Sequence, residues 1–142
     1  MKNVNVYLNF GGKTEEALNF YKDCMGGEIV SIQRYGDSPM EMPEEHKNGV
    51  MHAEFKSEGV YFMASDGQPG QPLTAGNVVS LSLNLDDRDE QTHIFDKLSE
   101  GGNVMMPLAD QFWGARFGML TDKYGINWML NCHTEKTDKQ YV

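Results

Sequence analysis

The sequence has few cysteines, few basic residues and no long apolar run. Its two cysteines, Cys24 and Cys132, lie in neither a C-x-x-C motif nor a His/Cys cluster, so a zinc site built on them is not expected. Lysine and arginine number 12 against 21 acidic residues, which gives a formal net charge of −9. Because such a chain repels phosphate groups, we expect neither nucleic acid nor an anionic membrane surface as a partner.

No stretch reaches the length of a membrane span, and the first residues lack the apolar core of a signal peptide. We therefore expect a cytoplasmic protein. The chain has 142 residues, of which 39% are hydrophobic and 23% charged, and it contains 15 glycines. These values are ordinary for one compact α+β domain with its own core.

The first half of the chain predicts the element order β-α-β-β-β. Apolar and polar residues alternate over residues 3–10, which is typical of a strand with one buried face, here Val4, Val6, Leu8 and Phe10. Thr14 is the expected N-cap of a helix that ends at Gly26-Gly27. The predicted apolar face of this helix consists of Ala17, Phe20, Tyr21, Cys24 and Met25. Three strands are expected next, at residues 28–35, 50–56 and 60–65, the last two joined at Glu58-Gly59.

The second half repeats this order. Residues 78–85 alternate with the same parity, and Asp87 with Glu90 resembles a capping box before a helix whose apolar face is Ile94, Phe95 and Leu98. Gly101-Gly102 ends this helix. Strands are predicted at residues 103–112, 115–122 and 126–132.

The two halves are in register. Phe10 and Leu85, Phe20 and Phe95, and Gly26 and Gly101 are each separated by 75 positions, and the later hairpins correspond at 66. This series predicts an internal duplication. We divide the chain into a first module (1–66), a linker (67–76), a second module (77–133) and a polar tail (134–142), forming one structural domain overall.

Two β-α-β-β-β copies resemble the vicinal oxygen chelate superfamily, which includes glyoxalase I, bleomycin-resistance proteins and extradiol dioxygenases. Several motifs resemble its PhnB-like branch: Tyr7-Leu-Asn-Phe10, Glu16-Ala-Leu-Asn-Phe-Tyr21, Gly26-Gly27, Met106-Pro-Leu-Ala-Asp-Gln-Phe-Trp-Gly114 and Thr121-Asp-Lys-Tyr-Gly-Ile-Asn-Trp128. The resemblance implies the glyoxalase/bleomycin-resistance fold, in which each module forms a U-shaped mixed sheet around a cavity. It also implies a homodimer.

In metal-using members of the superfamily, His, Gln or Glu ligands come from the first and last strands of each module. The matching positions here are Asn5 (or Val6), Met63, Ser80 and Met129. Thioethers, an aliphatic side chain and a hydroxyl are poor ligands for the metals concerned, so we predict no metal site and no cofactor. The branch has carried a methyltransferase label, but the chain lacks a glycine-rich S-adenosylmethionine motif.

Strand parity assigns a set of polar and thioether residues to the cavity side: Asn5, Tyr7, Asn9, Tyr61, Met63, Ser65, Ser80, Ser82, Asn84, Asn127, Met129 and Asn131. This neutral set suits ligand binding better than acid–base chemistry, although the same residues could simply fill a narrow cleft. The candidate ligand-binding residues are Tyr7, Asn9, Tyr61, Ser82, Trp113 and Met129. The candidate catalytic residues are His52, Glu54 and Arg116, with His52 and Glu54 on one strand face.

Trp113, Gly114 and Arg116 stand together at a strand boundary. Parity counted from Gly114 places Ala115, Phe117 and Met119 toward the core and Arg116 opposite it. Arg116 then needs a partner, either an acid such as Asp110 or Asp122 or an anionic ligand group. We expect a structural ion pair for Arg116 and a pocket-wall role for Trp113.

These observations favour a metal-free protein that binds a small molecule in a cavity. The first alternative is an enzyme, either a metal-dependent lyase, isomerase or dioxygenase of the same superfamily or one that uses the three catalytic candidates directly. The second alternative is a dimeric scaffold without a ligand.

Overall fold

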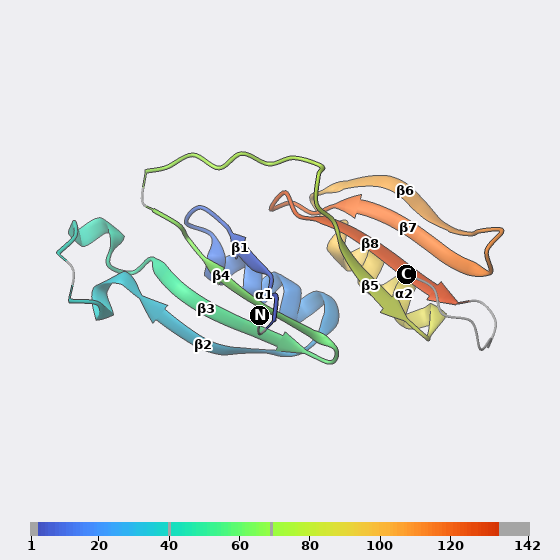
Figure 1. The fold of residues 1–142 in the computed structure, drawn as a ribbon, viewed down its shortest axis with the longest axis horizontal. Coiled ribbons are helices and arrows are strands. Elements are labelled where there is room, and N and C mark those ends of the chain that lie inside the picture. Colours follow the sequence, from blue (N-terminus) through green and yellow to red (C-terminus); the bar gives the residue numbers. More distant parts are fainter. Residues whose placement is uncertain (1–2, 40, 69, 134–142) are drawn as a thin grey trace. The chain divides into compact units, whose positions relative to one another are not determined.

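The computed structural model describes residues 3–39, 41–68 and 70–133, and the chain forms two compact units, Met1–Thr74 and Ala75–Val142 (Figure 1). Each unit contains one α-helix and one four-stranded mixed sheet, so the predicted α+β class is confirmed. The division between the units falls inside the predicted linker, whereas the predicted tail lies outside the described residues. Among the described residues, no helix is long and apolar enough to cross a membrane.

Unit 1 has the predicted order β-α-β-β-β. Its elements are β1 (Tyr7–Asn9), α1 (Thr14–Met25), β2 (Glu28–Arg34), β3 (Val50–Ser57) and β4 (Val60–Ser65), with the short 3-10 helices η1 (Tyr35–Asp37) and η2 (Glu44–His46) between β2 and β3. The sheet order is β1-β4-β3-β2. β1 runs parallel to β4, and the other neighbours are antiparallel.

Unit 2 repeats this topology. Its elements are β5 (Leu81–Leu85), α2 (Arg88–Leu98), β6 (Asn103–Asp110), β7 (Ala115–Thr121) and β8 (Asn127–His133). The sheet order is β5-β8-β7-β6, with β5 parallel to β8 and the remaining pairs antiparallel. Two halves that are in register in the sequence therefore fold into two units with the same strand order.

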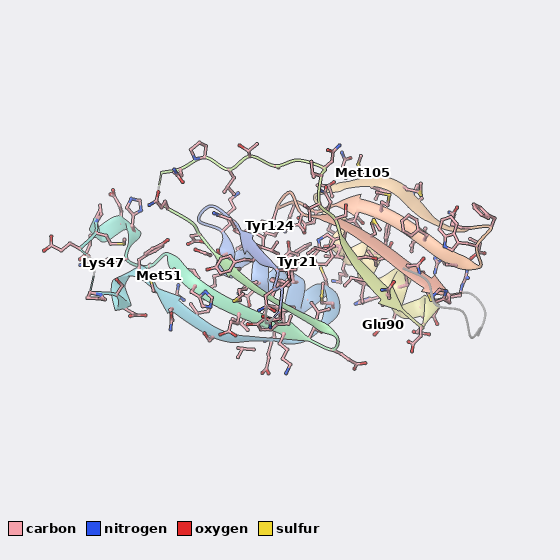
Figure 2. All side chains as sticks on the ribbon, viewed as in Figure 1. Tyr21, Lys47, Met51, Glu90, Met105 and Tyr124 are labelled. Atoms are coloured by element: carbon pink, nitrogen blue, oxygen red, sulfur yellow. The ribbon has the colours of Figure 1, made fainter. Side chains whose placement is uncertain are left out.

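The core of unit 1 lies between α1 and one face of its sheet. Tyr21 of α1, labelled in Figure 2, is fully buried. Its ring meets that of Phe62 edge-on at 5.8 Å between centroids, and Phe62 stacks on Phe55 of β3. The sequence pattern missed Leu18, which is fully buried, and it overrated Phe20 and Met25, which are half-buried. The opposite face of the sheet points away from α1, and we call it the helix-free face of unit 1. The face of the unit 2 sheet that points away from α2 is named in the same way.

The core of unit 2 is built in the same way, with Phe95 and Leu98 of α2 over Trp128, Leu130 and Leu120. The Trp128 indole N–H donates to Oδ2 of the buried Asp122 at 2.8 Å. The other oxygen of this carboxylate accepts the backbone N–H groups of Tyr124 and Ile126. Asp122 thus closes the β7–β8 turn.

The predicted N-cap of the first helix is wrong. Thr14 is the first helical residue, and the cap position is Lys13, which makes no side-chain capping bond. Instead, Asp66 accepts the Thr14 backbone N–H at 2.9 Å from beyond the end of β4. In unit 2 the predicted cap is confirmed, because Asp87 accepts the Glu90 backbone N–H at 2.9 Å.

The first strand of each unit is shorter than predicted. β1 begins at Tyr7 and β5 at Leu81, and the repeat-equivalent Val4 and Val79 are 87% and 69% exposed rather than buried. Alternation alone predicted buried apolar faces there, but it does not show whether another element covers that part of the strand.

Candidate functional site

The helix-free face of unit 1 carries most of the predicted site residues of the first module. In β3 and β4 the alternate residues Ala53, Phe55, Phe62 and Ala64 are buried on the helix side, which leaves His52, Glu54, Tyr61 and Met63 on the other side. Tyr7 of β1 is opposite Met63, and Met63 is opposite Glu54. The structure therefore brings Tyr7, His52, Glu54, Tyr61 and Met63 together on one face.

The titratable groups on this face form two tyrosine pairs. The Tyr7 hydroxyl and the His52 Nδ1 atom are 3.0 Å apart, and the Tyr61 hydroxyl donates to Glu54 Oε1 at 2.8 Å. The hydrogen bond to Glu54 raises the pKa of Tyr61, with smaller contributions from desolvation and from the glutamate charge. His52 and Glu54 share a face as predicted, but each is bonded to a tyrosine.

The helix-free face of unit 2 is chemically different. One row across the strands joins Ser82, Met129 and Met119, and the next row joins Asn84, Asn131 and Phe117. These are hydroxyl, thioether, amide and aromatic groups, and none of them carries a charge. These two rows of unit 2 are thus neutral, whereas the helix-free face of unit 1 carries titratable groups. His133 lies on the same side of β8 as Met129 and Asn131, beside the second row.

Trp113 lies at the tip of the β6–β7 hairpin. Its ring meets that of Phe117 at 67° with 5.9 Å between centroids, and the side chain is 36% exposed. Its neighbour Phe112 is 97% exposed. Trp113 therefore extends the aromatic part of the unit 2 face toward the hairpin tip, a position compatible with the predicted wall role.

The predicted orientation of Arg116 is wrong. Arg116 shares the helix side of β7 with Gly118 and Leu120, and its Nη1 donates to the Thr92 hydroxyl and to the Arg88 carbonyl on α2. Gly118 sets this parity, because a Cβ there would lie under 3.0 Å from the Phe95 ring. Phe117 and Met119 therefore belong to the helix-free face and not to the core that parity predicts for them.

The predicted ion pair of Arg116 with Asp110 or Asp122 is also not formed. Asp110 pairs with Arg88 at 2.9 Å, and Asp122 serves the β7–β8 turn. The Arg116 contacts given above are to neutral oxygens of α2. Arg116 is thus a structural link between β7 and α2 and leaves the set of candidates on the helix-free face.

The positions that hold metal in related folds were tested against their side-chain chemistry. Met63 and Met129 both lie on helix-free faces, on β4 and β8, while Asn5 and Ser80 precede the first strands of their units. Neither a thioether nor a neutral amide or hydroxyl suits zinc, nickel, iron or manganese. In the part of the chain that the structure describes, no group of three His, Cys, Asp or Glu residues could hold a metal ion.

A separate cavity of about 440 Å³ lies in unit 1, and the sequence did not predict it. It is lined by the Gly11-Gly12 turn, the end of β2, the loop before β3 and the chain after β4. Its lining includes the ion pair between Arg34 and Glu15, with Nη2 and Oε1 3.0 Å apart. None of the candidate ligand-binding or catalytic residues lines this cavity.

Comparison with known proteins places the chain in a family. A family model described as 3-demethylubiquinone-9 3-methyltransferase matches residues 2–131. Protein PA1353 from Pseudomonas aeruginosa is 38% identical, with 92% of this chain and 98% of that chain covered and a TM-score of 0.79. The PhnB protein from Bacillus cereus is 35% identical, with 92% and 99% covered and a TM-score of 0.78.

A more distant structure shares the fold alone. A glyoxalase/bleomycin resistance protein/dioxygenase from Nocardioides is 19% identical, with 100% of this chain and 91% of that chain covered and a TM-score of 0.57. The duplicated β-α-β-β-β topology, the motifs from Tyr7 to Trp128 and the matched relatives agree. The chain belongs to the PhnB-like family, whose model is described as 3-demethylubiquinone-9 3-methyltransferase, and has the glyoxalase/bleomycin-resistance fold.

Proposed function

We propose that this protein binds a small organic molecule on the helix-free faces of its sheets, without a metal site of the superfamily type. The observation that carries this proposal is the side-chain chemistry of the unit 2 face, where amide, hydroxyl, thioether and aromatic groups lie side by side in strand register. Such a mixture of apolar surface and a few hydrogen-bonding groups is typical of ligand sites.

The proposal that the protein has no metal site of the superfamily type is supported by the side chains at Asn5, Met63, Ser80 and Met129, which are poor metal ligands. Met63 and Met129 occupy equivalent places in the two units, so both last strands present a thioether where a carboxylate or imidazole would be needed. A metal bound there would have to recruit ligands from elsewhere. Elemental analysis of the purified, untagged protein is expected to find no stoichiometric zinc, nickel, iron or manganese.

A second candidate function is metal-free catalysis on the unit 1 face. The hydrogen-bonded Tyr7–His52 and Tyr61–Glu54 pairs favour it, because both combine a proton donor with a base within normal hydrogen-bond distance. The two functions are compatible, since binding to the neutral face of unit 2 is a separate step from chemistry in unit 1. A cytoplasmic homodimer is part of the same proposal.

The dimer is supported by apolar side chains that single units leave exposed. Val4, Val78, Val79 and Phe112 are 87%, 94%, 69% and 97% exposed. Burying such residues against a second copy would remove apolar surface from water. Light scattering at micromolar concentration is expected to give twice the chain mass, and a monomer would favour a different cover for these residues.

A thermal-shift screen against a metabolite library tests the binding proposal. Ser82→Tyr places a large ring on the exposed edge strand of the unit 2 face and is expected to abolish the ligand-induced rise in melting temperature. His93→Tyr puts the same ring on an exposed position of α2 and is the matched control. Ligand responses that survive Ser82→Tyr, or a screen in which no compound stabilises the parent protein, would count against binding on this face.

A further inference from the structure

Asn131 combines burial with an unused hydrogen-bonding group. Its side chain is 3% exposed, and within the described parts of the chain its Nδ2 is buried without a hydrogen-bond partner. The neighbouring Leu130 and Cys132 are fully buried on the helix side of β8, so Asn131 belongs to the helix-free face. A buried amide without a partner opposes folding, because it loses water and gains no bond in return.

The equivalent position in unit 1 shows how the fold can satisfy a polar residue here. Ser65 corresponds to Asn131 at the repeat distance of 66, and it is also nearly buried, at 8% exposed. Its hydroxyl accepts the Gly67 backbone N–H at 2.9 Å. Unit 1 therefore supplies a protein partner at this position, whereas none of the described residues accepts a hydrogen bond from the Asn131 amide in unit 2.

The neighbours of Asn131 define the chemistry of that partner. Asn84 and Phe117 flank it in register, and the Trp113 ring lies edge-on to Phe117. The adjacent row supplies the thioethers of Met129 and Met119, which make favourable contacts with aromatic rings. No member of either row is charged, and Arg116 of the same strand reaches α2 instead. A carboxylate would thus meet no lysine or arginine in either row of a chain of net charge −9, and the titratable side chain nearest in strand register is that of His133, two residues beyond Asn131.

We propose that Asn131 donates a hydrogen bond to the neutral carbonyl oxygen of an aromatic ligand whose ring packs against Phe117 and Trp113. This inference rests on the proposed function, since it assigns a ligand class to the same face. Because Asn131 is 3% exposed, the ligand reaches the amide only when the flanking side chains shift. Trp113, which is 36% exposed and touches Phe117, is placed to report that shift by its fluorescence.

Three probes of similar shape distinguish the contribution of the carbonyl oxygen to binding from that of the aromatic ring. They are 2-acetylnaphthalene, 2-naphthoate and 2-ethylnaphthalene. They offer a neutral carbonyl, a carboxylate and no acceptor, respectively. The parent protein is expected to bind the ketone at least about tenfold more tightly than the ethyl compound, because only the ketone satisfies the amide. The carboxylate is also expected to bind more weakly than the ketone. Fluorescence titration of the parent and of Trp113→Phe measures the affinities and assigns the signal.

Asn131→Leu keeps the side-chain volume but removes the amide. Its melting temperature is expected to equal or exceed that of the parent, and its preference for the ketone over the ethyl compound is expected to disappear. Ser65→Ala is the matched control in unit 1 and should keep the preference. If Asn131→Leu fails to fold, the side-chain amide resonances of Asn131 in the parent protein decide instead, since they should shift with the ketone and not with the ethyl compound.

Equal binding of the ketone and the ethyl compound to the parent protein would overturn this inference and leave binding on the face intact. A preference that persists in Asn131→Leu would overturn it as well. If no probe binds, the assigned ligand class is wrong, while the metabolite screen with Ser82→Tyr still decides the proposed function.

Discussion

At the scale of single residues, the pKa of Tyr61 gives a direct test of the unit 1 face. Its pKa is raised from the ordinary value of 10.0, mainly by the hydrogen bond to Glu54. Glu54→Gln removes the charge and weakens that bond, so the pKa of Tyr61 is expected to fall toward 10.0. An ultraviolet difference titration measures it, with Tyr61→Phe identifying the Tyr61 contribution.

The sign of the linked stability effect follows from this shift. A raised pKa means that the folded state favours the neutral phenol, so the stabilisation is complete below pH 10.0 and is lost as the pH rises through the raised value. The stability difference between the parent and Glu54→Gln should therefore shrink in strongly alkaline solution. An unchanged Tyr61 titration in Glu54→Gln would show that the two side chains do not interact in solution.

Residue-scale roles were only partly predictable from the sequence. His52 and Glu54 could be assigned to one face because they alternate on one strand, but their tyrosine partners come from β1 and β4. Arg116 was misplaced because Ala115, Phe117 and Met119 looked like a core-facing set. The informative residue was Gly118, whose missing side chain makes room for Phe95, and that requirement is not visible in strand parity.

At the scale of elements, Thr14 tests how α1 begins. If its hydroxyl capped the helix, removing it would cost about 1 kcal/mol. The structure instead shows a buried Thr14 hydroxyl without a partner among the described residues, with Asp66 bonded to the backbone N–H. Thr14→Val keeps the shape and is therefore expected to leave the free energy of unfolding unchanged or higher.

Asp87→Ala is the comparison, because Asp87 makes a true capping bond on α2 and its loss should cost about 1 kcal/mol. Urea denaturation of both variants measures the difference. Equal destabilisation by the two substitutions would mean that Thr14 does cap α1.

The glycines that directly precede β2 and β6 make a second prediction at this scale. A Cβ at Gly102 would lie under 3.0 Å from the Thr121 carbonyl oxygen, and one at the equivalent Gly27 would approach the Lys56 carbonyl oxygen in the same way. Gly102→Ala is expected to destabilise the fold by about 1–3 kcal/mol, because backbone rather than a flexible side chain must move. Gly76→Ala, where nothing lies within 4 Å, is the control and should be close to neutral. A neutral Gly102→Ala would contradict this close packing.

Element order was predictable because the duplication repeats each signal. The Gly-Gly pairs, the helical faces and the tight hairpins each occur twice at fixed sequence distances. An element predicted in one half therefore supports the prediction of the same element in the other half. The lengths of β1 and β5 were not predictable, because alternation continues through Val4 and Val79 although neither unit covers them. The alternation of apolar and polar residues predicts which side of a strand a residue faces, whereas its burial depends on which other elements pack against that side.

At the scale of the whole molecule, the two units share a topology and differ in the chemistry of their helix-free faces. Unit 1 presents the Tyr7–His52 and Tyr61–Glu54 pairs, and unit 2 presents neutral amides, thioethers and rings. The neutral groups of unit 2 support the proposed ligand binding, and the tyrosine pairs of unit 1 support the second candidate function. Met63 and Met129, at the positions that the resemblance to metal-using proteins assigns to ligands, support the proposal that this chain holds no metal there.

The most direct test of ligand binding on these faces is a methyl spectrum of the methionines during titration with a metabolite library. Met63, Met119 and Met129 lie on helix-free faces, whereas Met25 ends α1 and Met42 lies in the loop before β3. The account predicts that a ligand shifts the methyl signals of the first group and leaves those of Met25 and Met42 in place. Shifts confined to Met25 or Met42, or signals from Met63 and Met129 broadened by a bound paramagnetic metal, would contradict it.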